Sequence, residues 1–242
     1  MRILVANANT TEAITALCAE AARAAAAPGT TIIPATPRFG PAVIATRLEN
    51  AIAAHALLEL LAEHAGQVEA VVLAVSHDTA LEAARQLMPC PVIGMTEAAC
   101  LTACMVGARF GLVTLGGVET YRELIGRHGL AARLAGLEGV AATPQDAVRD
   151  PAAVEALVLD SVGRLVAAGA DSVVLGGAAL AGMAARLAAP VPLLDGIACA
   201  VKLGEALAGL GLARPSAGTL APAQGRASTG LSPALTRLLR GA

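Results

Sequence analysis

Aromatic residues are scarce in this sequence: two phenylalanines, one tyrosine and no tryptophan occur among 242 residues. Unpaired nucleic-acid bases are usually held by stacking on aromatic rings, so this scarcity argues against single-stranded RNA or DNA as a partner. The formal net charge of −2 offers no positive field for a phosphate backbone either. We therefore expect no nucleic-acid partner and a core built from Ala, Val, Leu and Ile.

Cysteines are few and have no metal-binding pattern. The five cysteines form no C-x-x-C pair, which argues against a disulfide framework and against a zinc site. Cys100 and Cys104 lie one helical turn apart, as expected for two small apolar residues on a packed helix face. We expect no metal.

Long hydrophobic runs are also missing, although 56% of the residues are hydrophobic. The longest uncharged stretches, such as residues 172–185, fall short of the roughly 18 residues that a membrane span needs, and glycines interrupt them. A predicted strand begins at residue 3, and the helix that follows it carries acidic residues. Targeting peptides do not have this pattern. We expect a cytoplasmic protein without a membrane partner.

The sequence does contain short apolar runs that end on polar residues and are followed by helical spacing. Residues 68–97 are the central example: the run 71–75 precedes the polar residues 76–79, and a second run, 91–95, ends at residues 96–97. This pattern is typical of a buried parallel strand and its crossover helix. Ligands of open α/β sheets bind outside the carboxyl ends of the strands, so these polar residues are the first site candidates.

The pattern occurs twice along the chain. Residues 171–196 can be aligned with the central example, and residues 110–119 with residues 2–12. We interpret the chain as a tandem repeat of one α/β unit.

This interpretation predicts the α/β class, with two pseudo-symmetric, doubly wound parallel-sheet lobes and the active-site cleft between them. The first lobe would comprise residues 1–97 plus 200–242, and the second lobe residues 98–199. Strands are expected at residues 2–6, 30–35, 71–75, 91–95, 109–114, 137–142 and 173–175, and helices at residues 11–27, 42–65, 97–107, 119–128, 151–168, 197–209 and 232–239. Residues 212–230 would form an irregular strap.

Polar residues at the predicted strand ends are candidates for substrate binding: Asn7, Thr79, Thr114 and Glu97. Hydroxyl groups and free N–H groups at a helix start could bind a carboxylate or an imide oxygen. Gly177 either lets a ligand approach the backbone or allows tight strand-to-helix packing.

Arg47, near the start of a predicted helix, has two interpretations. It could reach a substrate carboxylate as a fork donor, or it could form an ion pair on the helix surface.

His77 lies between Ser76 and Asp78 in the sequence. Its ordinary pKa of about 6.5 suits proton transfer near neutrality. His77 could be a general base, could activate Ser76, or could simply be a polar residue at a strand end. Adjacent residues point in different directions, so this run is no evidence of a catalytic triad. Asp78 could simply cap the helix that follows it.

Four segments, residues 7–11, 77–81, 91–99 and 109–114, together resemble the aspartate/glutamate/hydantoin racemase superfamily, most closely its hydantoin and allantoin racemase branch. The resemblance extends over nearly the whole chain. It implies two pseudo-symmetric α/β lobes, a small-molecule substrate, neither metal nor organic cofactor, and a homo-oligomer.

The same resemblance implies two cysteines that face each other across the substrate carbon. The first position corresponds to Val75, or to Ser76 if the register shifts by one, and the second to Gly177. Neither position holds a thiol, and residues 176–180 contain no titratable side chain.

The predicted function is therefore a cofactor-independent racemase or isomerase acting on a small carboxylate or cyclic ureide, with His77 and Ser76 as catalytic residues. Two alternatives stay open: chemistry on one face of the substrate, such as decarboxylation, cis-trans isomerisation or hydrolysis, and a metabolite binder without activity.

Overall fold

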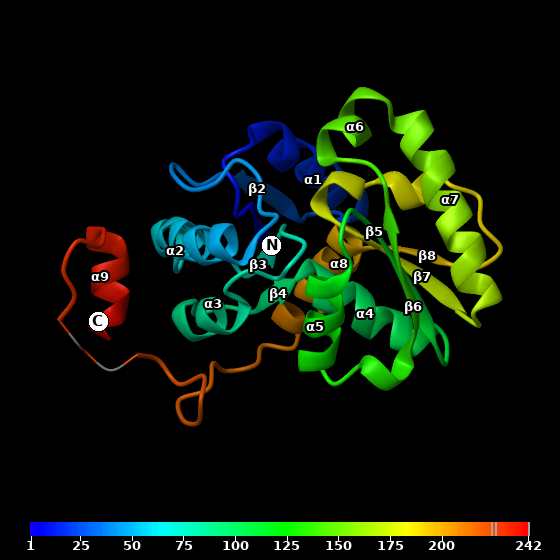
Figure 1. The fold of residues 1–242 in the computed structure, drawn as a ribbon. Helices are drawn as coiled ribbons and strands as arrows, with labels where there is room; N and C mark the ends of the chain where they lie inside the picture. The colour runs from blue at the N-terminus through cyan, green and yellow to red at the C-terminus, as the bar shows by residue number, and fades with distance from the viewer. Residues whose placement is uncertain (224, 226, 242) are drawn as a thin grey trace.

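A computed structural model describes residues 1–223, 225 and 227–241, and it contains two four-stranded parallel sheets (Figure 1). Sheet A has the order β2 (Thr31–Ala35), β1 (Arg2–Ala6), β3 (Ala70–Leu73), β4 (Val92–Gly94). Sheet B repeats this order with β6 (Leu134–Val140), β5 (Phe110–Leu115), β7 (Ser172–Gly176), β8 (Leu193–Asp195). The predicted α/β class with two parallel-sheet lobes is confirmed.

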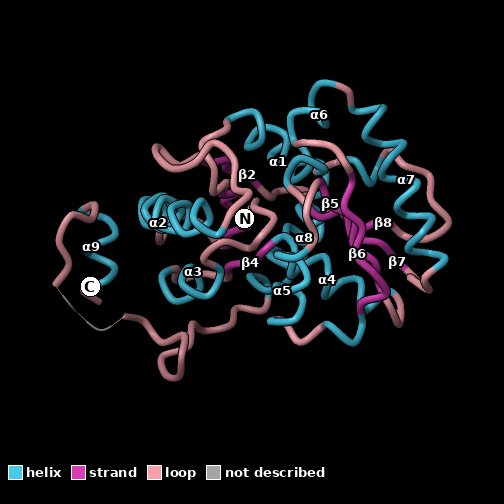
Figure 2. Tube along the Cα trace, viewed as in Figure 1, coloured by secondary structure: helices cyan, strands magenta, loops and turns pink. Residues whose placement is uncertain are grey.

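The helices are α1 (Glu12–Ala25), α2 (Arg47–His64), α3 (Leu81–Leu87), α4 (Met95–Val106), α5 (Glu119–Arg127), α6 (Pro144–Arg149), α7 (Pro151–Ala167), α8 (Gly196–Gly209) and α9 (Pro233–Leu239). Short 3₁₀ turns are η1 (Ala131–Arg133), η2 (Ala178–Leu180) and η3 (Met183–Ala185). Each sheet is covered on both faces, which explains why its strands are continuous apolar runs. In Figure 2, sheet B lies between α7 on one side and α4 and α5 on the other.

The two lobes exchange their last helices. Helix α4 follows sheet A in the chain but packs its Cys100 side against Phe110 and Val174 of sheet B. Helix α8 follows sheet B but packs Ala200 and Val201 against sheet A. The exchange is relevant to the predicted lobe boundaries, because it places α4 with sheet B and α8 with sheet A. The boundaries themselves remain a proposal.

Helix α2 begins later than predicted. Thr46 accepts a hydrogen bond from the Glu49 backbone, and the Glu49 side chain accepts one from the Thr46 backbone, so a capping box fixes the start at Arg47. Residues 42–45, which were expected to be helical, form a loop instead. The loop 42–45 reaches the cavity between the two lobes.

The second lobe departs from the predicted repeat in two places. Between the strand expected at residues 137–142 and the helix expected at 151–168, where no element was predicted, the chain forms α6, because Thr143 and Asp146 form a capping box and Pro144 occupies the first turn. After β7 the counterpart of α3 is replaced by the short turns η2 and η3. Gly177 and Gly182 introduce positive φ angles of 133° and 78° there, which a continuous helix does not accommodate.

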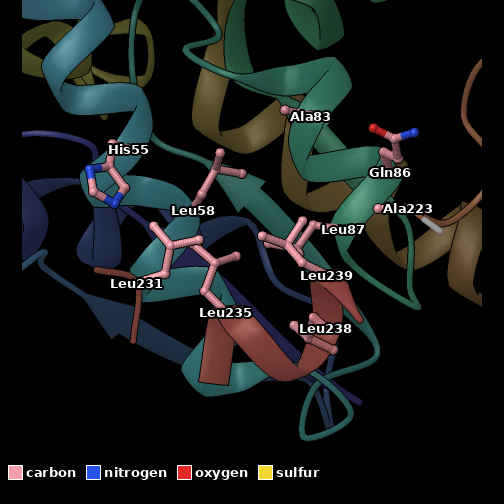
Figure 3. Close-up of a pocket in the computed structure, with 10 residues that line it drawn as sticks. All are labelled: His55, Leu58, Ala83, Gln86, Leu87, Ala223, Leu231, Leu235, Leu238 and Leu239. Carbon is pink, nitrogen blue, oxygen red and sulfur yellow. The ribbon is translucent and has the colours of Figure 1, made fainter. Parts of the chain in front are cut away.

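The C-terminal segment crosses back over the first lobe, and α9 packs beside α2 (Figure 1). A cavity of about 360 Å³ remains between α9, α2 and α3. Figure 3 shows its side chains, which are apolar apart from His55 and Gln86. The strap therefore lies on the first lobe, away from the ends of β5 and β7.

Among the described residues, no helix combines the length and apolarity that crossing a membrane requires. The same part of the chain contains no cluster of three or more His, Cys, Asp or Glu side chains that could hold a metal ion.

Candidate active site

A cavity of about 680 Å³ opens at the carboxyl ends of both sheets, where the two lobes meet. The first lobe lines it with Asn9, Thr11, Ala13, Ile14 and residues 42–45 and 75–77. The second lobe lines it with Arg149 and residues 114–117, 119–121, 142–145 and 176–179. A cleft of this size at strand ends is the expected position of a small-molecule site in such a fold.

Ser76 connects the two lobes at the floor of this cavity. Its hydroxyl accepts a hydrogen bond from the Ala178 backbone N–H at 3.3 Å, and its carbonyl accepts one from the Thr96 hydroxyl at 2.7 Å. A Cβ atom added at Gly177 would lie 3.8 Å from the Ser76 hydroxyl. Residue 177 therefore faces Ser76. Val75, which precedes Ser76 in the chain, also lines the cavity and is 4% exposed.

His77 also lines the cavity, and its ring packs edge-on against Tyr121 with 5.6 Å between ring centroids. Burial lowers the pKa of His77 below its usual range, because desolvation disfavours the imidazolium form. At neutral pH the ring is therefore neutral and can accept a proton.

Asp78 holds the loop that carries Ser76 and His77. Its carboxylate accepts backbone hydrogen bonds from Thr96 at 3.0 Å and Glu97 at 2.7 Å, at the start of α4. The expectation that Asp78 caps the helix directly after it is wrong, because the left-handed turn at Asp78, with φ 47°, directs the carboxylate to α4 instead. Burial raises the pKa of Asp78, while His128 and the two N–H groups oppose that rise.

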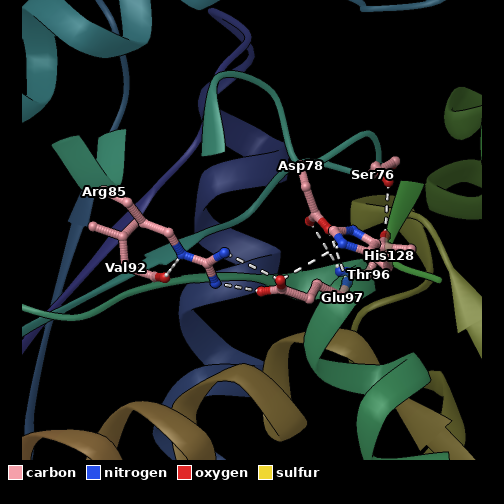
Figure 4. A network of polar contacts seen from close by, with 7 residues as sticks. All are labelled: Ser76, Asp78, Arg85, Val92, Thr96, Glu97 and His128. Atoms are coloured by element: carbon pink, nitrogen blue, oxygen red, sulfur yellow. Dashed lines mark hydrogen bonds and ion pairs between the residues drawn. The ribbon is translucent and has the colours of Figure 1, made fainter. Parts of the chain in front are cut away.

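Glu97, predicted to contact substrate, belongs instead to a polar network with Arg85 and His128 (Figure 4). Arg85 donates to it at 3.1 Å, and the His128 Nδ1 atom lies 3.6 Å away. The other ring nitrogen of His128 lies 3.8 Å from Asp78. Glu97 does not line the cavity and instead connects α3, α4 and the end of α5.

Three other predicted binding residues also point elsewhere. Asn7 is fully buried and donates to Thr15 at 3.0 Å. The Thr79 hydroxyl donates to Asn50 at 2.6 Å. Arg47 forms an exposed ion pair with Glu123 at 2.6 Å, outside the cavity lining. These side chains therefore fix the surrounding structure, and of the predicted site residues the cavity brings together Val75, Ser76, His77, Thr114 and Gly177.

Several residues that line the cavity were not predicted from the sequence. Tyr121 lies in the first turns of α5 and Arg149 at the end of α6, so neither occupies a strand end. The loop 42–45 and Ile14 give the first lobe an apolar wall. The one available signal for Tyr121 was that it is the only tyrosine in the chain.

The chain also has close relatives among known proteins. A protein-family model described as Asp/Glu/Hydantoin racemase matches residues 3–204. A hydantoin racemase of Paenarthrobacter aurescens is 36% identical over 221 residues, which cover 87% of this chain and 92% of the relative.

Two solved structures are similar over almost their full length. An allantoin racemase from Klebsiella pneumoniae has a TM-score of 0.92 and 36% identity, covering 97% of this chain and 98% of that chain. The allantoin racemase from Pseudomonas fluorescens has a TM-score of 0.91 and 31% identity, covering 95% and 100% respectively. The fold, the family-model match and these relatives together establish that the chain belongs to the Asp/Glu/Hydantoin racemase family.

Proposed function

We propose that this protein is a racemase that transfers protons at an acidic carbon of a small cyclic ureide related to hydantoin, with neither a cofactor nor a pair of thiols. The observation that carries the proposal is His77: a histidine with a lowered pKa lines a cavity between the strand ends of two lobes. The relatives named as hydantoin and allantoin racemases support the substrate class.

In the proposed reaction, the His77 imidazole takes the proton from the acidic carbon. The electron pair of the broken C–H bond moves into the adjacent carbonyl group and gives an enolate. The hydroxyl groups of Ser76 and Thr114 line the same cavity and would donate to the enolate oxygen. Donors that are already in place stabilise such a charge most strongly in a site from which water is excluded.

The cavity wall gives this proposal a substrate preference. Ile14 and residues 42–45 are apolar, whereas the floor at Ser76, His77 and Thr114 is polar. A ureide ring on the floor would place an apolar substituent of its acidic carbon against that wall. We expect aliphatic or aryl hydantoins to react faster than allantoin, whose substituent is polar.

Polarimetry with single enantiomers of substituted hydantoins, allantoin and amino acids tests the proposed function. Loss of optical rotation with hydantoins supports it. Unchanged rotation with every compound in the panel, while calorimetry shows that the hydantoins bind, would contradict it.

A second candidate, chemistry on one substrate face, is favoured by one observation. Residues 176–179 of the second lobe are two glycines and two alanines, so this strand end itself supplies no acid or base. Decarboxylation, cis-trans isomerisation or hydrolysis would need a group on one side only. Such chemistry would appear in the same panel as a new product.

The cysteines provide a prediction about the proposed mechanism. Among the described residues, no cysteine lines the cavity, and burial raises the pKa of Cys18 to about 12 and of Cys90 to about 11. Because the thiolate is the reactive form, treatment with iodoacetamide should leave turnover unchanged within about a factor of two. Mass spectrometry of the treated protein counts the modified thiols, and activity that falls in step with that count would overturn the thiol-free site.

The two arginines near the cleft should behave differently. Arg47 lies in an ion pair whose side chains are 82% and 50% exposed, so Arg47→Ala should change the KM for any substrate by less than about twofold. Arg149 lines the cavity, and Arg149→Ala should raise the KM for substrates that carry a carboxylate by roughly tenfold. The KM values of both variants for a charged and an uncharged hydantoin check this, and equal effects of the two substitutions would contradict it.

A further inference from the structure

Among the described residues, the titratable side chains that line the cavity are His77, Glu119, Tyr121 and Arg149. Racemisation by two proton-transfer groups needs one group on each face of the substrate carbon. The positions and chemistry of these side chains therefore determine whether the cavity offers such a pair.

His77 and Tyr121 lie on the same side of the cavity. Their rings contact each other edge-on, with 5.6 Å between the ring centroids and 69° between the ring planes. Burial raises the pKa of Tyr121, so its phenol stays protonated at neutral pH and takes no proton from carbon. The two rings therefore supply one base, His77, to one face of a bound substrate.

The other titratable side chains supply no base to the opposite face. The Glu119 side chain is 79% exposed at the start of α5, and its carboxylate lies 3.6 Å from Arg122 at the surface. Arg149 carries a guanidinium group, which does not lose its proton in proteins. Of the two positions at which the family resemblance places a thiol, Val75 is apolar and Gly177 has no side chain.

The floor of the cavity suits a substrate ring in two orientations. A hydroxyl group both donates and accepts hydrogen bonds, and the floor carries the hydroxyls of Ser76, Thr114 and Tyr121. On either side of its acidic carbon, a hydantoin ring has a carbonyl group and an N–H group. Turning the ring about the axis through that carbon exchanges these two groups and presents the opposite face to His77. The same hydroxyls can bind the ring before and after the turn.

The cavity also has room for this movement. Its volume of about 680 Å³ lies in the range that accommodates drug-sized ligands. A hydantoin is a single small ring and fills only part of this space. Residues 176–179 are glycines and alanines, so the end of β7 adds no large side chain to obstruct the ring.

We infer that His77 alone moves the proton in both halves of racemisation, and that the planar enolate turns over in the cavity between them. This inference rests on the proposed function, in which His77 is the base.

The reaction balances with this one group. His77 removes the proton, and the C–H electron pair enters the carbonyl group, which gives an imidazolium and a planar enolate. After the enolate has turned over, the imidazolium N–H bond breaks, the electron pair returns to carbon, and the proton forms the new C–H bond on the opposite face. The imidazole is then neutral again, and no second donor takes part.

Isotope exchange at low conversion tests this inference. The wild-type protein is incubated in deuterated water with one enantiomer of an alkyl-substituted hydantoin, the enantiomers are separated by chiral chromatography, and mass spectrometry measures the deuterium in each. Exchange without protein is subtracted. If the imidazolium exchanges with solvent before the enolate turns, deuterium enters the recovered reactant without inversion. If the enolate turns first, the new enantiomer retains the hydrogen of the substrate. A single base leaves at least one of these two signatures.

The contrary results separate the inference from the proposed function. A fully deuterated new enantiomer beside a recovered reactant without deuterium would require a second group on the opposite face. That result would overturn the inference and leave the proposed function standing. Exchange without any loss of rotation would show that the enolate does not turn, and would contradict both. Absence of both exchange and racemisation would remove the proposed function, and the inference with it.

Filling the cavity gives a second test. Ala13 of α1 is exposed and lines the cavity, so Ala13→Leu places a larger side chain there without disfavouring the helix. The ratio of exchange in the recovered reactant to racemisation should rise roughly fivefold or more, because crowding hinders the turn but not proton removal. Both rates come from one reaction, so weaker binding lowers them together and leaves their ratio unchanged.

Ala16→Leu is the matched control, because Ala16 is exposed on the same helix and lies outside the cavity lining. This variant should keep the wild-type ratio, and circular dichroism of both variants confirms that they are folded. If Ala13→Leu also keeps the wild-type ratio, the enolate does not turn within the cavity and the inference is wrong.

Discussion

Replacing His77 with Asn should lower kcat/KM for racemisation by roughly 10²- to 10⁴-fold, the usual contribution of a general base. The amide is polar and of similar size, but it cannot take a proton from carbon. His64→Asn is the matched control, because His64 ends α2 and does not line the cavity. Wild-type turnover in the His77 variant would remove this residue from the mechanism.

The pH dependence should identify the same group. Only the neutral imidazole accepts a proton, and burial lowers the pKa of His77. Activity should therefore persist as the pH falls below about 6.5 and decline only when the pH passes through the lowered pKa. The acidic limb of kcat/KM against pH measures this. An acidic limb that gives a pKa at or above the ordinary histidine value would contradict the assignment of His77 as the base.

Replacing Asp78 with Ala should have the largest effect on stability, a loss of about 3–5 kcal/mol in the free energy of unfolding. The substitution leaves the Thr96 and Glu97 N–H groups without their buried acceptor, and it removes the carboxylate that lies 3.8 Å from His128. It also places alanine at a φ of 47°, a left-handed conformation that Asp and Asn tolerate better.

Urea denaturation of Asp78→Ala and Asp78→Asn measures this effect. The Asn side chain keeps one oxygen acceptor and suits the left-handed turn, so its loss should be clearly smaller. If both variants unfold at the wild-type urea concentration, the carboxylate does not anchor the loop of Ser76 and His77 to α4.

Much of the fold was predictable because its strands are short apolar runs with sharp polar ends. The strand expected at residues 2–6 matches β1, and the helix expected at residues 151–168 matches α7 within one residue. The start of α2 was missed because its capping box lies inside an apolar pattern that continues from residue 42. Helix α6 was missed because its short segment contains Pro144, Asp146 and Asp150, residue types that are common in loops.

The site was less predictable, because a strand end shows which residues are near the cleft but not which way they point. Ser76, His77 and Thr114 line the cavity, whereas Thr79 turns to Asn50. The difference arises from the left-handed turns at Asp78 and Ala80, which the sequence does not signal.

The contribution of Tyr121 depends on tertiary structure. Its position on α5 has no relation in sequence to Gly176, and only the packing of the ring on that glycine brings the hydroxyl to the cavity. The sequence showed only that residues 176–180 carry no titratable side chain, whereas the folded chain places the Tyr121 hydroxyl beside Gly177 from a helix.

The central claim is proton transfer at a carbon acid, and one measurement tests it most directly. The wild-type protein is incubated in deuterated water with a single enantiomer of an alkyl-substituted hydantoin, while NMR follows the hydrogen on the acidic carbon and polarimetry follows the rotation. The account predicts that deuterium enters that carbon as the rotation falls to zero. A new product without deuterium at that carbon, or a bound hydantoin that keeps both its hydrogen and its rotation, would contradict it.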